Sequence, residues 1–112
     1  MGLRNLPTDV ARPLTSLIDD AEPGRVSSRS LTRLSDVCQI MLLSFAAGES
    51  VSDEEYPADT MYYLLEGCAG ITFAQEGRAP VPLVAGEVLL VPAGVRHAVE
   101  PAGAIKLLQL SL

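Results

Sequence analysis

The sequence lacks the features that mark membrane, secreted and disulfide-stabilised proteins. It has no run of eighteen apolar residues, which argues against a membrane-spanning helix. Its first twelve residues lack the apolar segment of a signal peptide. We therefore expect a cytoplasmic protein in a reducing compartment. The only two cysteines, Cys38 and Cys68, lie among apolar residues, and we expect both to be free thiols buried as small hydrophobes.

Basic residues are also scarce, because eight Lys and Arg face fourteen Asp and Glu and the net charge is −6. Binding to nucleic acid or to an anionic membrane surface requires a basic patch, so the composition argues against both. Five acidic residues fall close together in one segment, and they form either a solvated loop or a negative rim around a pocket or a cation. They are Glu49, Asp53, Glu54, Glu55 and Asp59.

The chain has no internal repeat and no alternation of strands with helices, which disfavours a parallel α/β fold. Its length and its 48% hydrophobic content fit one domain with a real core. Residues 1–25 contain three prolines and one short segment of helical character, Pro13–Asp20. We interpret residues 1–25 as an arm that docks elsewhere, either as a lid on the domain or on a partner.

From Val26 onwards the pattern predicts short strands separated by turns. Val37–Phe45 is almost continuously apolar, and Gly48 follows it closely, so we predict a strand that is covered on both faces. Pro80 and Pro82 confine the segment around them to a sheet edge or an extended connection. Further strands are predicted at 26–34, 60–65, 70–74, 87–91 and 104–112. This spacing indicates an antiparallel sandwich or barrel.

The turn residues of the second half carry a specific resemblance. Gly86, Pro92, Gly94 and His97 follow the spacing G-x5-P-x-G-x2-H, which resembles the second conserved motif of the cupin superfamily. The Asn that ends the family motif falls on Pro101 in this chain.

The first cupin motif is recognisable by its frame, which in this chain reads Gly48-x5-Glu54-x-Tyr56-x3-Thr60-x6-Gly67. The resemblance implies a small single-domain cupin of the conserved-barrel type. Its expected fold is all-β: a double-stranded β-helix, or jelly-roll barrel, over residues 26–112, preceded by the short arm of residues 1–25.

Typical cupins bind a divalent metal through two His and one Glu of the first motif and one His of the second. The resemblance places these ligands on Glu54, Tyr56, Thr60 and His97, of which only His97 keeps its residue type. Glu54 is a possible second ligand, but a third good donor is missing, which predicts a degenerate metal site. Alternatively, His97 hydrogen-bonds a neighbouring Tyr or Glu, and we favour a Glu54–His97 pair. Such a pair could also perform acid–base chemistry.

Strand periodicity places Thr60, Tyr62 and Leu64 on the same inward face as Glu54 and Tyr56. These groups either line a pocket for a small organic ligand or fill a closed barrel. The first predicted function is therefore a metal-poor cupin that binds a small molecule. The alternatives are a small cupin isomerase, lyase or dioxygenase that uses Glu54 and His97, and a filled-barrel interaction protein. A homodimer is also expected, in which Val26–Leu34 extends the partner's sheet.

Overall fold

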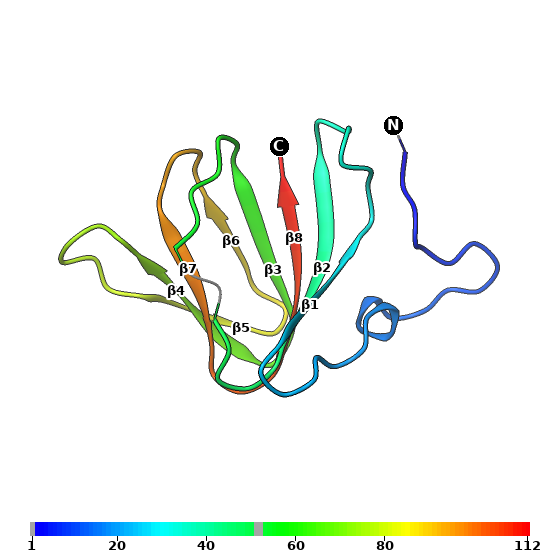
Figure 1. Cartoon of the computed structure of the whole chain (residues 1–112), viewed down its shortest axis with the longest axis horizontal. Coiled ribbons are helices and arrows are strands. Elements are labelled where there is room, and N and C mark those ends of the chain that lie inside the picture. Colours follow the sequence, from blue (N-terminus) through cyan, green and yellow to red (C-terminus); the bar gives the residue numbers. More distant parts are fainter. Residues whose placement is uncertain (1, 51–52) are drawn as a thin grey trace.

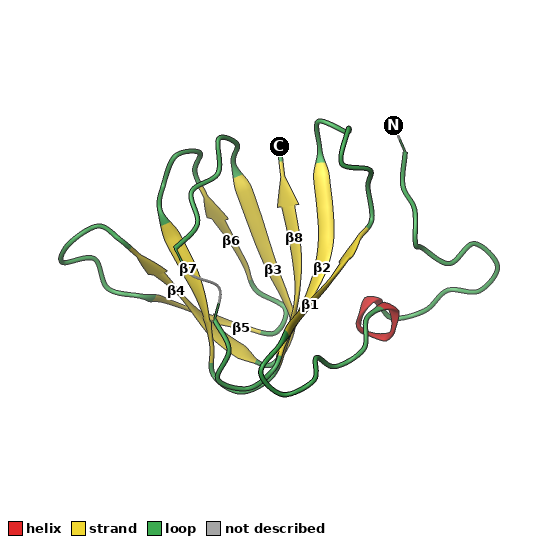
Figure 2. Cartoon of the chain, in the orientation of Figure 1, coloured by secondary structure: helices red, strands yellow, loops and turns green. Residues whose placement is uncertain are grey.

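The computed structural model describes residues 2–50 and 53–112. These residues form one short 3-10 helix and eight strands (Figures 1 and 2). The helix η1 spans Leu14–Leu17, and Pro13 precedes it. The strands are β1 (Val26–Ser30), β2 (Gln39–Phe45), β3 (Thr60–Glu66), β4 (Cys68–Phe73), β5 (Val81–Val84), β6 (Val88–Val91), β7 (His97–Pro101) and β8 (Ile105–Ser111).

The strands pair antiparallel in two sheets that face one another. One sheet has five strands in the order β1-β2-β8-β3-β6, and the other has three in the order β5-β4-β7. In Figure 1 the three-stranded sheet lies to the left of the larger one and the two converge at the bottom. The predicted all-β antiparallel barrel is confirmed.

Most predicted strands are present, and one was missed. β2 lies inside the predicted segment Val37–Phe45. β5 contains Pro82 and is an edge strand, as the prolines required. The strand that was not predicted is β7, which begins at His97. Its first three residues are all buried, so no period-two pattern is visible in its sequence.

The inner faces of the two sheets enclose the main core. Thr60, Tyr62 and Leu64 of β3 are buried, while Met61 and Tyr63, which alternate with them, are only half-buried. This alternation confirms the predicted inward face of β3. The buried members of the core are Phe45, Tyr62, Leu64, Ala69, Ile71, Leu83, Val91, Val99, Ile105 and Leu107.

Residues 1–25 were expected to form an arm that docks elsewhere, as a lid on the domain or on a partner. The described part of this segment packs on the outside of its own barrel, and docking on a partner stays a prediction. Leu17 and Ile18 pack with Leu31 against Leu42, which points away from the barrel on the outer face of β2. Figure 2 shows the arm running outside the five-stranded sheet, on the side of β1. The arm supplies the second apolar cover that the continuous hydrophobicity of β2 requires.

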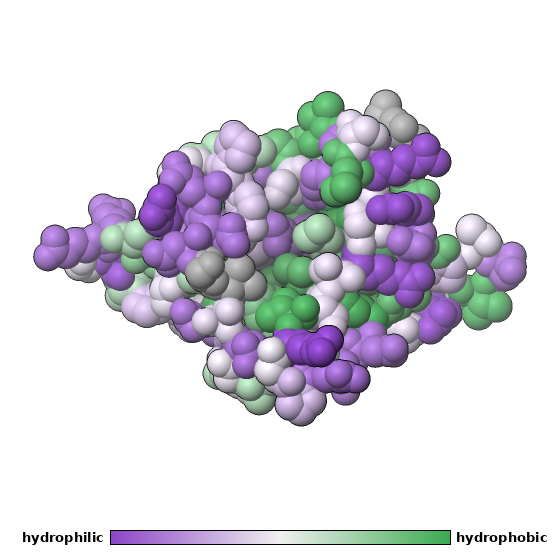
Figure 3. Space-filling model, viewed as in Figure 1, coloured by the Kyte–Doolittle hydropathy of each residue, from purple (hydrophilic) through white to green (hydrophobic). Residues whose placement is uncertain are grey.

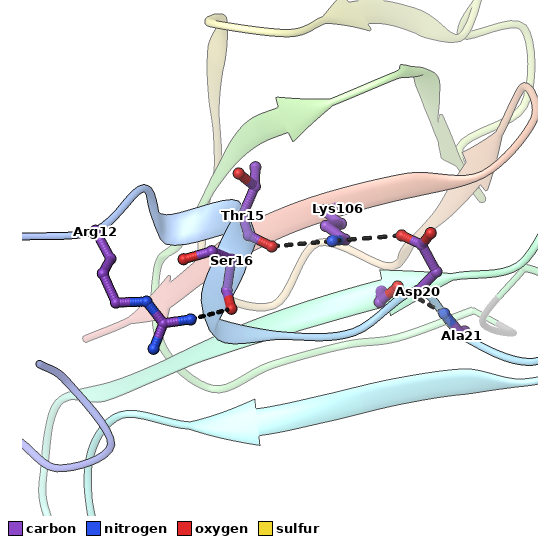
Figure 4. A network of polar contacts seen from close by, with 7 residues as sticks. Arg12, Thr15, Ser16, Asp20, Ala21 and Lys106 are labelled. Carbon is purple, nitrogen blue, oxygen red and sulfur yellow. Dashed lines mark hydrogen bonds and ion pairs between the residues drawn. The ribbon is translucent and has the colours of Figure 1, made fainter.

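Polar contacts fix the arm to the sheet (Figure 4). The Lys106 Nζ of β8 donates a hydrogen bond to the Thr15 carbonyl at 2.9 Å and lies 3.3 Å from the Asp20 carboxylate. The Ala21 N–H donates to the Ser44 hydroxyl at 3.0 Å. The aliphatic part of Lys106 is covered, and its charged end reaches the arm.

Lys106→Met is therefore expected to lower the free energy of unfolding by about 1 kcal/mol, because the Thr15 carbonyl loses its donor while the buried volume is kept. The variant should also be cleaved faster by chymotrypsin at Leu17, which is buried while the arm is docked. Urea denaturation and timed proteolysis check this. The control is Arg25→Met, whose pair with Glu22 is exposed on both sides and should change stability by less than about 0.5 kcal/mol. Equal effects of the two substitutions would contradict the role of Lys106.

Three further expectations have mixed outcomes. Both cysteines are free as predicted, but only Cys38 is partly buried, whereas Cys68 is exposed and does not act as a small core hydrophobe. β1 pairs with β2 of its own chain, and the homodimer stays a prediction. The described residues contain no helix of the length and hydropathy that a membrane span needs.

Candidate functional site

The loop before β3 runs antiparallel to the turn that leads into β7. Glu54 and His97 exchange backbone hydrogen bonds, at 2.6 Å for the Glu54 N–H and 2.9 Å for the His97 N–H. The Gly94 N–H donates to the Tyr56 carbonyl at 2.8 Å, and the Ala93 N–H to the Asp59 carboxylate at 2.9 Å. Directly opposed residues of an antiparallel pair point to the same side, so Glu54 and His97 share a face. The two sequence motifs are thus joined at one edge of the barrel.

His97 is 1% exposed, and both of its ring nitrogens have hydrogen-bond partners. Its Nδ1 lies 2.8 Å from the Val95 carbonyl, which can only accept, so Nδ1 carries a proton. Its Nε2 lies 2.7 Å from the Tyr62 hydroxyl. In the neutral imidazole, Nε2 is then the acceptor and the phenol donates. The favoured side-chain partner in the sequence was Glu54, whereas the structure places Tyr62 in that position.

The Tyr62 phenol belongs to β3 and reaches His97 across the barrel from the opposite sheet. Its burial raises its pKa well above the ordinary value of 10.0, and the nearby Tyr56 and Glu54 raise that pKa further. The phenol therefore keeps its proton throughout the neutral range and acts as a steady donor to Nε2. The Tyr62 and His97 rings meet edge to face, with centroids 5.5 Å apart.

A cavity of about 150 Å³ opens beside this pair. Glu54, Tyr56, Tyr62 and His97 line it, so the structure brings four of the five predicted site residues together. Thr60 is buried, but it does not line the cavity, and its hydroxyl lies 3.1 Å from that of Ser111. The lining residues that sequence analysis missed are Met41, Leu43, Phe45, Ala98, Val99 and Gln109. On the face shown in Figure 3, hydrophobic residues gather at the centre, over β8 and β2.

Gln109 is the polar residue among those missed. It lies directly opposite Tyr62 in the β3–β8 register and is 8% exposed. A signal was present in the sequence, because Gln109 is a polar residue at an inward position of a mostly apolar strand. The Gln109 amide, the Glu54 carboxylate and the Tyr56 hydroxyl all border the cavity, and within residues 2–50 and 53–112 the structure gives none of them a side-chain hydrogen bond or ion pair.

These donors do not fit a divalent metal. Among the described residues, no group of three His, Cys, Asp or Glu side chains is placed to hold one. The Nε2 of His97 is engaged by Tyr62, and Nδ1 by Val95, so metal binding would first break a buried hydrogen bond. Glu54 is the single carboxylate that lines the cavity. The position of the third family ligand is occupied by Thr60, which faces Ser111 instead.

The raised pKa of Tyr62 has a consequence at high pH. Above pH 10 the unfolded chain releases this proton while the folded chain retains it, so the free energy of unfolding falls as the pH rises. We expect a loss of at most about 1.4 kcal/mol per pH unit from this one proton. Urea denaturation between pH 8 and 11, at intervals, measures the slope. Tyr62→Phe should flatten it, and Tyr63→Phe, on the outer face of β3, should not. A slope unaffected by Tyr62→Phe would contradict the assignment.

A scan with protein-family models and a search of curated proteins gave no match. Solved structures do match. A cupin superfamily protein from Desulfitobacterium hafniense is 46% identical, with a TM-score of 0.92, and the match covers 100% of this chain and 98% of that one. A conserved protein of unknown function from Streptococcus pyogenes is 26% identical, with a TM-score of 0.87, over 100% and 94% of the two chains.

A third match is a DMSP lyase from Ruegeria pomeroyi, which is 25% identical with a TM-score of 0.68, over 78% of this chain and 46% of the lyase. The jelly-roll barrel, the two motifs joined at one edge and the full-length match at 46% identity agree. The chain belongs to the cupin superfamily.

Proposed function

We propose that this cupin binds a small organic molecule at its barrel mouth without a metal ion. The observation that carries the proposal is that some polar groups of the cavity are paired with each other while others have no side-chain partner. His97 and Tyr62 satisfy each other, whereas Glu54, Tyr56 and Gln109 face the same cavity without side-chain partners among the described residues. Polar groups that converge on a mainly apolar cavity are typical of a ligand site.

The size of the cavity supports an open barrel over a filled one. A cavity of about 150 Å³ matches the engineered protein cavity that binds benzene, so it holds about six non-hydrogen atoms. A filled barrel would instead place a side chain in this space. The enzyme alternative lacks a specific observation in its favour, because the Tyr62–His97 contact leaves no free basic nitrogen beside Glu54.

A fragment screen by NMR tests the proposal. Small organic fragments should shift the resonances of Tyr62, His97 and Gln109, and bound fragments should compete with one another. Met41→Trp should abolish binding by filling the mouth, since Met41 lines the cavity. The matched control is Met61→Trp, which places the same bulk on the outer face of β3 and should leave binding unchanged. The proposal fails if no fragment shifts these residues, or if the two tryptophan variants behave alike.

A further inference from the structure

The ionisable groups that line the cavity are one carboxylate, two phenols and one imidazole. They belong to Glu54, Tyr56, Tyr62 and His97, and no Lys or Arg of the described chain lines the cavity with them. The His97 ring is neutral when it accepts from Tyr62, as described above. The site therefore carries a negative charge from Glu54 with no positive group of its own to balance it.

Two of the groups that line the cavity, Tyr62 and Glu54, offer a ligand hydrogen-bond acceptors only. The Tyr62 hydroxyl donates its hydrogen bond to Nε2 of His97, so only the lone pairs of its oxygen are left for a ligand. Glu54 offers two acceptor oxygens. Gln109 is more than nine-tenths buried, and its amide has no side-chain partner within the described residues. This amide and the Tyr56 hydroxyl can each donate as well as accept. A ligand that fits Tyr62 and Glu54 brings hydrogen-bond donors or a positive charge.

Aromatic rings form part of the wall. Tyr56, Tyr62 and Phe45 line the cavity, and the Tyr56 and His97 ring centroids lie 5.9 Å apart at 59°. Aromatic faces attract cations, with about 0.5–2 kcal/mol per contact depending on desolvation. Phenol rings beside a carboxylate are thus complementary to an organic ammonium group.

The residues around the entrance to the cavity are also negatively charged. Asp53 and Glu55 flank Glu54 and are exposed. Arg96, which lies beside His97 in sequence, is the nearby basic residue, and its guanidinium is 3.5 Å from the Glu55 carboxylate. This pair neutralises Glu55 and leaves Asp53 and Glu54 to attract a positive ligand.

We infer that the ligand is a small organic cation of about six non-hydrogen atoms, with its charged nitrogen at Glu54 and its carbon atoms against Leu43 and Val99. This inference rests on the proposed binding function. It names the chemical class, an amine or methylated ammonium, and excludes carboxylate and phosphate ligands from the site.

The test uses three probes of similar size that differ in charge: butylammonium, 1-butanol and butyrate, each titrated into the full chain and followed by NMR. Butylammonium should bind at least about tenfold more tightly than the other two, because a charged hydrogen bond exceeds a neutral one. Glu54→Gln keeps the shape and should reduce butylammonium affinity about tenfold while leaving 1-butanol unchanged. The control Glu55→Gln should change it less than about twofold.

The outcomes separate the two proposals. If 1-butanol or butyrate binds as tightly as butylammonium at Tyr62 and Gln109, or Glu54→Gln has no effect, the cation inference is overturned and the binding function stands. If none of the three probes shifts Tyr62, His97 or Gln109 at millimolar concentration, both are overturned. Backbone amide spectra of each variant confirm that it is folded before the titration.

Discussion

Replacing Gly67 by alanine is expected to lower the free energy of unfolding by about 3 kcal/mol or more, through backbone strain and overpacking together. Gly67 has a φ of +92°, in the region that L side chains rarely adopt. A Cβ at this position would lie 2.6 Å from the Ala104 carbonyl oxygen and 2.9 Å from Cγ2 of Ile105. The turn between β3 and β4 would have to move away from the start of β8.

The matched control is Gly77→Ala. Gly77 has a similar φ of +78°, but a Cβ there would meet no atom within 4 Å. Its expected cost is the strain alone, about 1–2 kcal/mol. Urea denaturation of both variants gives the difference, which isolates the contact with Ala104. If the two variants lose the same stability, the close approach of β8 to this turn is not a constraint on the fold.

Tyr62→Phe is expected to lower the free energy of unfolding by about 2 kcal/mol, the cost of leaving one buried nitrogen without a partner. The ring and its packing stay, and only the hydroxyl that donates to His97 Nε2 is lost. Tyr63→Phe on the outer face of the same strand should change stability by less than about 0.5 kcal/mol. Urea denaturation at neutral pH measures both.

The same substitution has a second expected effect. With Nε2 released, Tyr62→Phe should show a change in its His97 resonances on addition of Zn²⁺ or Ni²⁺, whereas the unmodified chain should not. A Tyr62→Phe variant as stable as the unmodified chain would mean that the phenol and the imidazole do not pair in solution.

The fold could be predicted because the local signals agree with it. The frame from Gly86 to His97 marked the turn that carries the histidine, and Gly67 marked the end of β3. The apolar run of β2 correctly required two covered faces. It could not say what supplies the second cover, because the arm and the sheet are joined by contacts between distant residues such as Thr15 and Lys106.

The sequence predicted which residues line the candidate site better than it predicted which of them pair with one another. The alternation of side chains along a strand placed Glu54, Tyr56 and Tyr62 on one face, and all three line the cavity. The partner of His97 depends on how β3 and β7 face each other from different sheets, which no period in the sequence encodes. β7 itself was missed because its buried residues do not alternate.

Tyr62 holds the Nε2 of His97, so this nitrogen is not available to a metal. His97 is the only histidine of the chain, so long-range ¹H–¹⁵N NMR of tag-free protein reports its ring alone. We predict a neutral ring protonated at Nδ1, with nitrogen shifts unchanged by Zn²⁺, Mn²⁺ or Fe²⁺. A ring protonated at Nε2, or an Nε2 signal that moves stoichiometrically with added metal, would contradict the account.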